Sequence, residues 1–238
     1  AGDLDGDGDI DLAVGVTGTP SLQVLYNDGD GSFGAPYASG WVNSESKAVC
    51  CADLDGDGIA DIASASGADG MASIWLADGY GNLGYDGQYP TGDDPKSFSC
   101  GDYDGDGDVD LVLVNRGSND LSVYLNDGTG TLETAGRYKT GFDPRSVCSG
   151  DLDGDGDPDL ATADASGSAA TVIMNLSDEV TGAGGGEVIP AGIRPILNYP
   201  NPFNPLTTIR FALRLEGPVN LRIYDAGGRL VSSLIDGR

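Results

Sequence analysis

The chain has 238 residues, 38 acidic and 12 basic side chains, no histidine, and a formal net charge of −26. This charge excludes nucleic acid and anionic membrane surfaces as partners and favours cations. Without histidine, the commonest general base and the usual zinc sites are excluded. No apolar run reaches the length of a membrane span. The chain lacks a signal peptide and opens inside an aspartate-rich loop, which predicts a fragment or a processed product.

An aspartate-rich nonapeptide occurs four times along the chain. DLDGDGDID begins at Asp3, DLDGDGIAD at Asp53, DYDGDGDVD at Asp102 and DLDGDGDPD at Asp151. The steps between them are 50, 49 and 49 residues. A regular period of this length indicates a structural repeat.

Short alternating segments with β-branched residues follow each nonapeptide and predict strands. The first two strands of each repeat are expected at 11–16 and 22–26, 61–66 and 72–76, 110–115 and 121–125, and 159–164 and 170–174. Asp-Gly turns at 27–31, 77–81 and 126–130 favour hairpins. A third strand is expected around Tyr37, Tyr89 and Tyr138, and a fourth at 47–51, 96–100 and 145–148.

Four short strands in about 50 residues match the size of one propeller blade. The predicted fold class is therefore all-β, with four propeller blades followed by a partial β-sandwich. The first repeat lacks the strand before its loop, and the last lacks the Asp-Gly turn and the outer strand. Because a propeller protects its edges by closure, these blades are expected to form an open arc or part of a larger ring.

Each nonapeptide carries aspartate at positions 1, 3, 5 and 9 and glycine at position 6. Calcium takes six to eight hard oxygen ligands, and the glycine permits a sharp turn around the ion. We therefore expect about four Ca²⁺ ions, one per loop, with a backbone carbonyl contributed by position 7. The predicted metal ligands are Asp3, Asp5, Asp7, Asp9, Asp11, Asp53, Asp55, Asp57, Ile59, Asp61, Asp102, Asp104, Asp106, Asp108, Asp110, Asp151, Asp153, Asp155, Asp157 and Asp159.

The loops fit competing metal-binding motifs less well. An EF-hand needs an acidic ligand at position 12 and a following helix, but position 12 is Val14, Ser64, Leu113 or Thr162 and the next segment is strand-like. Tandem calcium β-rolls would repeat the nonapeptide without long gaps. Magnesium demands a tighter octahedron. A solvated acidic turn would not explain four recurrences of the same ligand positions.

Two further groups of residues recur with the repeat. Four cysteines, Cys50, Cys51, Cys100 and Cys148, precede the loops by two or three residues, which predicts one repeated structural position for a small buried side chain. A disulfide remains open at this level. Acid–base pairs also recur six to eight residues before the loops: Glu45 and Lys47, Asp94 and Lys96, Asp143 and Arg145. They are expected to form a local ion pair on each blade or a charged ring that contacts a ligand.

Residues 1–176 resemble the FG-GAP/VCBS repeats of integrin-α-type propellers and of many secreted bacterial proteins. The resemblance rests on the four loops, on the turns YNDGDGSF and YLNDGTGTL, and on the pair TGDDPKSFSCGDYDGDGDVDL and TGFDPRSVCSGDLDGDGDPDL. It implies a β-propeller whose loop carboxylates bind calcium and buttress the blades. It also implies adhesion or display of a ligand-binding surface.

The C-terminal part differs in composition. Residues 177–193 are rich in glycine and are expected to be a flexible linker. Residues 194–238 carry half of the 12 basic side chains and only 3 of the 38 acidic ones. Alternation predicts strands at 208–213 and 219–224, followed by a hairpin turn. YPNPFNP with TTI, and IYDAGGRLV, resemble the C-terminal sorting domain of type IX secretion and the immunoglobulin-like domain of flagellar hook-capping proteins. This implies bacterial export, with contact to the secretion machinery.

The function predicted from the sequence is a calcium-binding propeller module of an extracellular or cell-surface protein, for ligand binding, adhesion or scaffolding. Its partner would be a protein or a carbohydrate. The alternative is a non-catalytic accessory domain of a larger secreted enzyme, such as one that degrades polysaccharides. An enzyme using aspartates is not expected, because nearly all clustered aspartates lie in the loops. Asp69, Asp120 and Asp164 are left over, and turn chemistry is expected to explain them.

Overall fold

The computed structural model describes residues 1–18, 21–39, 45–166 and 169–175, together with the backbone of the strands at 193–199, 208–210, 220–224 and 230–236. Within these residues every regular element is a β-strand and every strand pairing is antiparallel. The described part of the chain has no helix long and apolar enough to cross a membrane. The prediction of an all-β fold is confirmed.

The strands form four successive sheets, which we name blades 1 to 4, and a separate hairpin. Blade 1 contains β1 (Leu12–Gly15), β2 (Leu22–Leu25) and β3 (Tyr37–Ser39). Blade 2 contains β4 (Ala48–Ala52), β5 (Asp61–Ser66), β6 (Met71–Ala77) and β7 (Leu83–Pro90). Blade 3 contains β8 (Pro95–Gly101), β9 (Asp110–Asn115), β10 (Asp120–Asn126) and β11 (Leu132–Lys139). Blade 4 contains β12 (Phe142–Gly150), β13 (Asp159–Ser166), β14 (Ala169–Asn175), β15 (Ile193–Tyr199) and β16 (Thr208–Arg210).

Blades 2 and 3 have the same strand order and nearly the same register. In each, sequential strands pair with their neighbours, from β4 to β7 and from β8 to β11. The aspartate-rich loop lies between the first and second strands, and the Asp-Gly turn lies between the third and fourth. Blade 1 lacks the strand that precedes the aspartate-rich loop, as the sequence predicts. A single β-bridge between Gly2 and Asp11 lies at that position.

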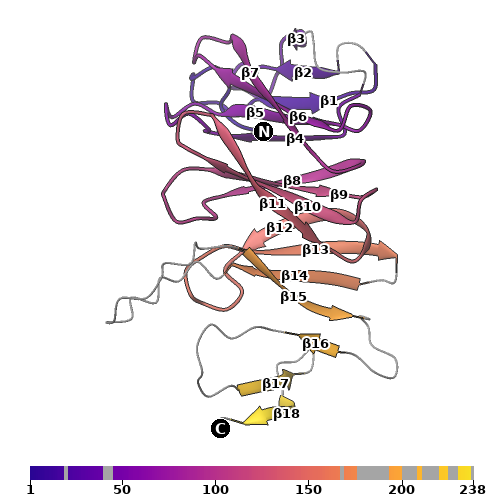
Figure 1. Ribbon diagram of the computed structural model, residues 1–238. Helices are drawn as coiled ribbons and strands as arrows, with labels where there is room; N and C mark the ends of the chain where they lie inside the picture. Colours follow the sequence, from indigo (N-terminus) through magenta and orange to yellow (C-terminus); the bar gives the residue numbers. More distant parts are fainter. Residues whose placement is uncertain are drawn as a thin grey trace.

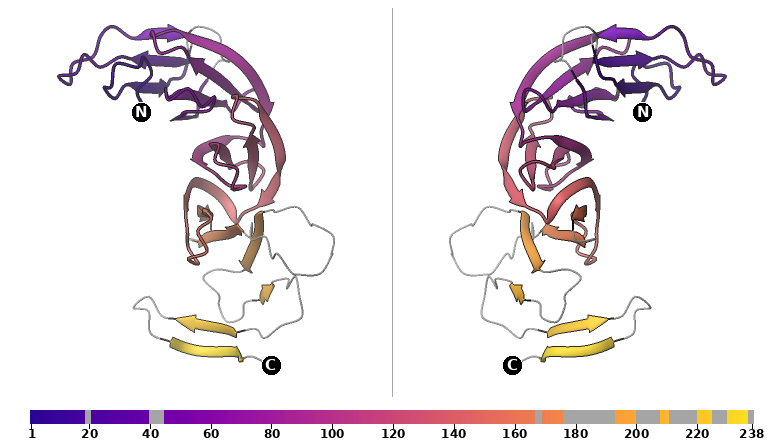
Figure 2. Two further views of the ribbon diagram at one scale, coloured as in Figure 1. Left: turned by 90° about the vertical axis from the view of Figure 1, so that its left-hand side faces the viewer. Right: turned by 90° about the vertical axis from the view of Figure 1, so that its right-hand side faces the viewer.

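The four blades follow one another along the molecule (Figure 1). Seen from the side, they trace a curved arc that does not close (Figure 2). The first strands of neighbouring blades contact each other, β4 with β8 and β8 with β12. This is the arrangement of propeller blades around an axis, and it confirms the predicted propeller-type architecture.

Each junction between blades contains its own apolar core. Each blade has two faces. We call a residue forward-facing when it packs toward the next blade in chain order, and backward-facing when it packs toward the preceding blade. At the junction of blades 2 and 3, Ala63 and Ile74 face forward and meet Leu111, Leu113 and Tyr124, which face backward. The other two junctions are built from the equivalent positions. The blades are therefore held together mainly by apolar area buried between sheets.

The fourth sheet differs from the sequence-based expectation that it lacks an outer strand. β15 pairs with β14 in the position that β7 and β11 occupy in their blades, and β16 pairs with β15. The strand that completes blade 4 thus comes from residues 193–199. The remaining strands, β17 (Asn220–Tyr224) and β18 (Leu230–Asp236), pair only with each other as a hairpin. The predicted linker at 177–193 lies almost wholly outside the described residues.

Candidate metal centre

The aspartate at position 1 organises each nonapeptide loop. In the first loop one carboxylate oxygen of Asp3 accepts the N–H of Gly6 at 2.7 Å, and the other accepts the N–H of Gly8 at 3.0 Å. Both glycines have positive φ angles, of 77° and 93°, which residues with a side chain rarely adopt. The other three loops repeat both bonds and the positive φ angles. The Asp-Gly-Asp-Gly pattern is therefore a requirement of the backbone path.

The aspartate at position 9 ties the loop to the sheet behind it. It is completely buried in all four loops. In blade 3, one oxygen of Asp110 accepts the N–H of Tyr103 at 2.7 Å and the other accepts the N–H of Asn126 at 2.8 Å. The same pair of bonds occurs at Asp11, Asp61 and Asp159. A buried carboxylate with two backbone donors fixes the loop against the end of the third strand.

Carboxylate oxygens converge in every loop. Three aspartates in each offer oxygen atoms that all lie within 4.8 Å of one another. Oxygen ligands of calcium lie about 2.3–2.6 Å from the ion, so two ligands of one ion are at most about 5 Å apart. The donor set therefore fits calcium in chemistry and in spacing. The converging residues are Asp3, Asp5 and Asp11; Asp53, Asp55 and Asp57; Asp102, Asp104 and Asp110; and Asp151, Asp153 and Asp159.

Electrostatics in the loops oppose this accumulation of negative charge. Burial raises the pKa of Asp61 and Asp110 to about 6, and neighbouring carboxylates add to the increase while backbone N–H groups act against it. Burial, assisted by adjacent carboxylates, also raises the pKa of the position-3 aspartates Asp5, Asp55, Asp104 and Asp153. A bound cation would reverse both contributions, because it stabilises the ionised carboxylates.

The predicted ligands at positions 5 and 7 lie mostly outside the three-residue oxygen clusters. At position 5, all four aspartates accept the N–H of position 7. Asp57 also joins its cluster, whereas Asp7, Asp106 and Asp155 lie outside the three-residue groups. At position 7, the carboxylates of Asp9 and Asp108 lie over Gly29 and Gly128 of the Asp-Gly turn. The side chains of Asp9 and Asp108 thus lie against the turn, and the backbone carbonyl is the donor that these two residues can offer to the cluster.

The loops also make contacts to the following blade that the sequence analysis missed. The side-chain amide of Asn126 in blade 3 donates to the carbonyl of Leu54 in the loop of blade 2, at 2.7 Å. Asn175 in blade 4 donates to the carbonyl of Tyr103 in the loop of blade 3, also at 2.7 Å. Asparagine recurs at this position in three of the four repeats, which could have revealed it, but Ala77 breaks the pattern in blade 2. Each of these loops is therefore bonded across a blade junction.

At the opposite end of the first strands, the recurring acid–base pairs form a ladder of ion pairs. The local pairs predicted from the sequence are confirmed, with Lys96 at 2.8 Å from Asp94 and Arg145 at 3.0 Å from Asp143. The ladder also crosses blade junctions, because Lys47 of blade 2 reaches Asp94 of blade 3 at 3.3 Å. Arg116 bridges Asp94 and Asp143. These partly exposed pairs link neighbouring blades, each for a small gain in stability.

Of the three aspartates that turn chemistry was expected to explain, only Asp69 lies in a turn. Asp69 accepts the hydroxyl of Ser66 at 3.3 Å in a turn, as expected. Asp120 and Asp164 instead lie in strands and are buried, so turn chemistry does not explain them. Asp120 pairs with Arg137 at 2.8 Å and Lys139 at 3.3 Å, and Asp164 accepts the hydroxyls of Thr162 and Thr171.

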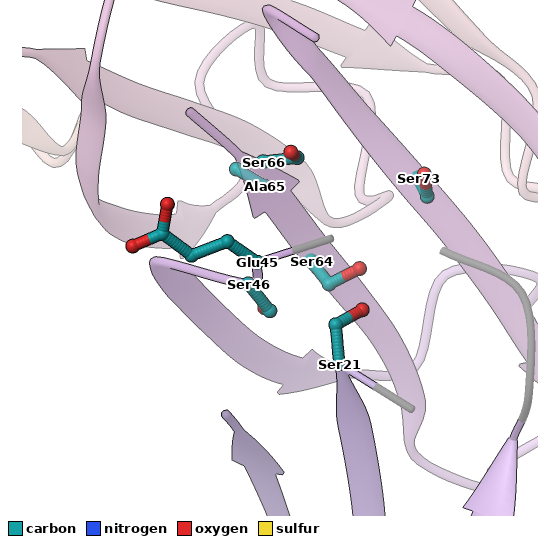
Figure 3. A pocket seen from close by; sticks show the side chains of 7 residues that line it. All are labelled: Ser21, Glu45, Ser46, Ser64, Ala65, Ser66 and Ser73. Carbon is teal, nitrogen blue, oxygen red and sulfur yellow. The ribbon is translucent and has the colours of Figure 1, made fainter. Parts of the chain in front are cut away.

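A small hollow lies at the junction of blades 1 and 2 and is lined mainly by serines (Figure 3). The carboxylate of Glu45 extends away from the hydroxyl groups of Ser21 and Ser64. The hollow has no room for even one enclosed water molecule. It therefore offers no substrate pocket.

A model of the FG-GAP-like repeat matches residues 3–64, 53–113 and 102–162. The chain belongs to the FG-GAP-like repeat family. Each matched segment begins at the first aspartate of a loop and runs through the loop of the next repeat. Each match therefore spans one blade junction and includes the loops on both sides of it.

No curated protein matches the chain. A solved structure from Agrocybe aegerita, described as a lectin that recognises non-reducing terminal N-acetylglucosamine, is similar with a TM-score of 0.48 and 23% sequence identity. The alignment covers 74% of this chain and 48% of that one, so the chain spans about half the length of that protein.

Proposed function

We propose that this FG-GAP-like chain is a calcium-binding propeller module of a secreted or cell-surface protein. It serves to present a surface to a protein or carbohydrate ligand, or to act as a rigid scaffold, and it has no catalytic activity of its own. The observation that carries the proposal is the fourfold recurrence of converging aspartate oxygens in loops that are tied into the blades.

Calcium would act on stability through the blade junctions. The position-9 aspartate contributes to a cluster in three loops and fixes the end of the third strand in all four. The carbonyls of Leu54 and Tyr103, in two of these loops, accept bonds from the next blade. An ion that binds only the ordered loop stabilises the folded state by mass action. Calcium in one blade is therefore expected to strengthen its contact with the next.

Calorimetric titration of calcium into protein freed of metal tests this proposal, with thermal unfolding measured alongside. The expected result is about four sites and a rise in melting temperature when calcium is present. Asp104→Asn is expected to remove one site. Asp86→Asn is the matched control, because it removes the same charge from an exposed position on β7 outside the loops. Absence of binding at millimolar calcium, or equal effects of the two variants, would overturn the metal assignment.

The absence of catalysis is supported by the roles of the buried acids outside the loops. Asp120 is neutralised by Arg137 and Lys139, and Asp164 is saturated by hydroxyl and backbone donors. Neither is presented as a free base. Screening the calcium-loaded protein against polysaccharides for both binding and cleavage tests this part of the proposal. Cleavage that is lost in Asp120→Asn or Asp164→Asn would refute it.

Export is the part of the proposal that rests on sequence motifs. The motifs at 199–209 and 223–231 support recognition by a secretion machinery, and β17 and β18 form a hairpin around the second one. Fusing residues 194–238 to a reporter in a bacterium with type IX secretion tests it. Retention of the reporter inside the cell would count against export through this segment.

A further inference from the structure

The four cysteines occupy two different positions of the blade, contrary to the sequence-based expectation of one repeated position. Cys50 lies opposite Ala63 in the register of β4 and β5, and Cys51 lies opposite Ile62. Residues directly opposite on antiparallel strands share a face of the sheet. Ala63 belongs to the core between blades 2 and 3, whereas Ile62 belongs to the core between blades 1 and 2. Cys50 therefore faces forward and Cys51 faces backward.

The same reasoning places Cys100 against Cys50. Cys100 lies opposite Leu111 in the register of β8 and β9. Leu111 faces backward into the core between blades 2 and 3, and both Cys50 and Cys100 pack against that core. The two thiols lie close enough to each other to share a hydrogen bond. The pair thus joins β4 to β8, the first strands of neighbouring blades.

The junction of blades 3 and 4 shows how close two side chains come at the positions equivalent to Cys50 and Cys100. One repeat later, 49 residues on, Ser99 and Ser149 occupy the places of Cys50 and Cys100. Ser99 lies opposite Val112 and Ser149 opposite Leu160, both in the core between blades 3 and 4. The hydroxyl of Ser99 donates to that of Ser149 at 3.0 Å. The ends of the two side chains at this pair of positions are therefore in contact across the junction.

We propose that Cys50 and Cys100 are a redox site that forms a disulfide between blades 2 and 3. Neither Cys50 nor Cys100 is fully buried. With oxidised glutathione, one protein thiolate attacks the glutathione disulfide and releases one reduced glutathione. The second protein thiolate then attacks the mixed disulfide, forms the Cys50–Cys100 bond and releases the second. The two protein thiols lose two electrons and two protons, which the oxidised glutathione takes up.

The other two cysteines are internal controls. Cys51 faces blade 1, where its side chain lies beside Gly2. Cys148 takes the forward-facing position of blade 4 and is exposed, with its thiol 3.7 Å from the carbonyl of Ala161. The prediction that Cys148 is buried is therefore wrong, because among the described residues no blade follows blade 4 to cover it. Neither faces a second cysteine, so both are expected to remain free thiols in the monomer.

The test is oxidation of the calcium-loaded full chain with glutathione at dilute concentration, in a Cys148→Ser background that prevents cross-linking between molecules. The expected result is a fall from three free thiols to one, a loss of 2 Da, and a cross-linked peptide pair that contains residues 50 and 100. The melting temperature should rise by several degrees on oxidation, because the bond closes a loop of about 50 residues in the unfolded chain.

Variants separate the assigned pair from its neighbour. Cys51→Ser is expected to leave the cross-link unchanged, and Cys50→Ser or Cys100→Ser to abolish it. The double replacement Cys50→Ser with Cys100→Ser copies the Ser99–Ser149 pair, so it is expected to fold, and its melting temperature should not respond to glutathione. Three titratable thiols after oxidation, or a cross-link that survives Cys50→Ser, would overturn the proposal.

Discussion

Blades 2 and 3 and the terminal blades 1 and 4 carry the same apolar pattern but bury it to different extents. The second residue of the loop is 1% exposed at Leu54 in blade 2 but 56% exposed at Leu152 in blade 4. On the second strand, Leu113 of blade 3 is fully buried, whereas the equivalent Val14 of blade 1 is 38% exposed. The difference shows that a blade does not bury its own apolar face. The neighbouring blade does so, as in other repeat architectures.

This comparison is tested most strongly by truncating the loop leucines. Leu54→Ala is expected to lower the free energy of unfolding by about 2–5 kcal/mol, since it leaves a cavity in a packed junction. Leu152→Ala, at the equivalent position of the terminal blade, is expected to change it by less than about 0.5 kcal/mol. Urea unfolding in millimolar calcium measures both. Equal losses would mean that the end blade is covered in solution.

A smaller effect is expected from the asparagine that bridges two blades. Asn126→Ala removes the donor to the buried carbonyl of Leu54 and to the partly buried carbonyl of Val109. The expected cost is about 1–3 kcal/mol. In blade 1 the side-chain amide of the equivalent Asn27 makes only exposed bonds within its own blade, donating to Ile10 at 3.3 Å and accepting the N–H groups of Gly29 and Gly31. Asn27→Ala is therefore expected to cost less than about 1 kcal/mol, and the same denaturation measurement compares the two. A larger loss for Asn27→Ala would contradict the bridging role.

The smallest effect concerns pH and the loops of blades 2 and 3. Burial raises the pKa of Asp61 and Asp110 from 3.8 to about 6, so the folded calcium-free protein binds protons more tightly than the unfolded chain. Its stability should therefore rise as the pH falls from 7 through 6 toward 4. With calcium present the sign should reverse, because protons compete with the ion for the same carboxylates.

Melting temperatures at pH 7, 6 and 5, with and without calcium, measure this crossover. Asp110→Asn is the control, since the amide cannot titrate and should reduce the rise seen without calcium. Parallel pH profiles in the two conditions would contradict the link between these aspartates and the metal.

Much of the fold and of the metal loops followed from the sequence because both are local. The second strands of blades 2 and 3 begin and end where alternation predicts, at Asp61–Ser66 and Asp110–Asn115. The loop path is dictated within nine residues by glycines with positive φ and by the position-1 aspartate. β15 could not be predicted as part of blade 4, since it joins β14 only after an intervening segment of 17 residues.

The sequence by itself determined the four repeats, the strands within them and the convergence of oxygen ligands, because these depend on contacts within a few residues. Only the tertiary structure decided which neighbour each side chain meets. It separated Cys50 from Cys51, adjacent in sequence, by the alternation of side chains across a strand. It also paired Asn126 with Leu54 across 72 residues. Such contacts depend on how the blades stack, and one repeat contains no information about the residue that faces it from the next.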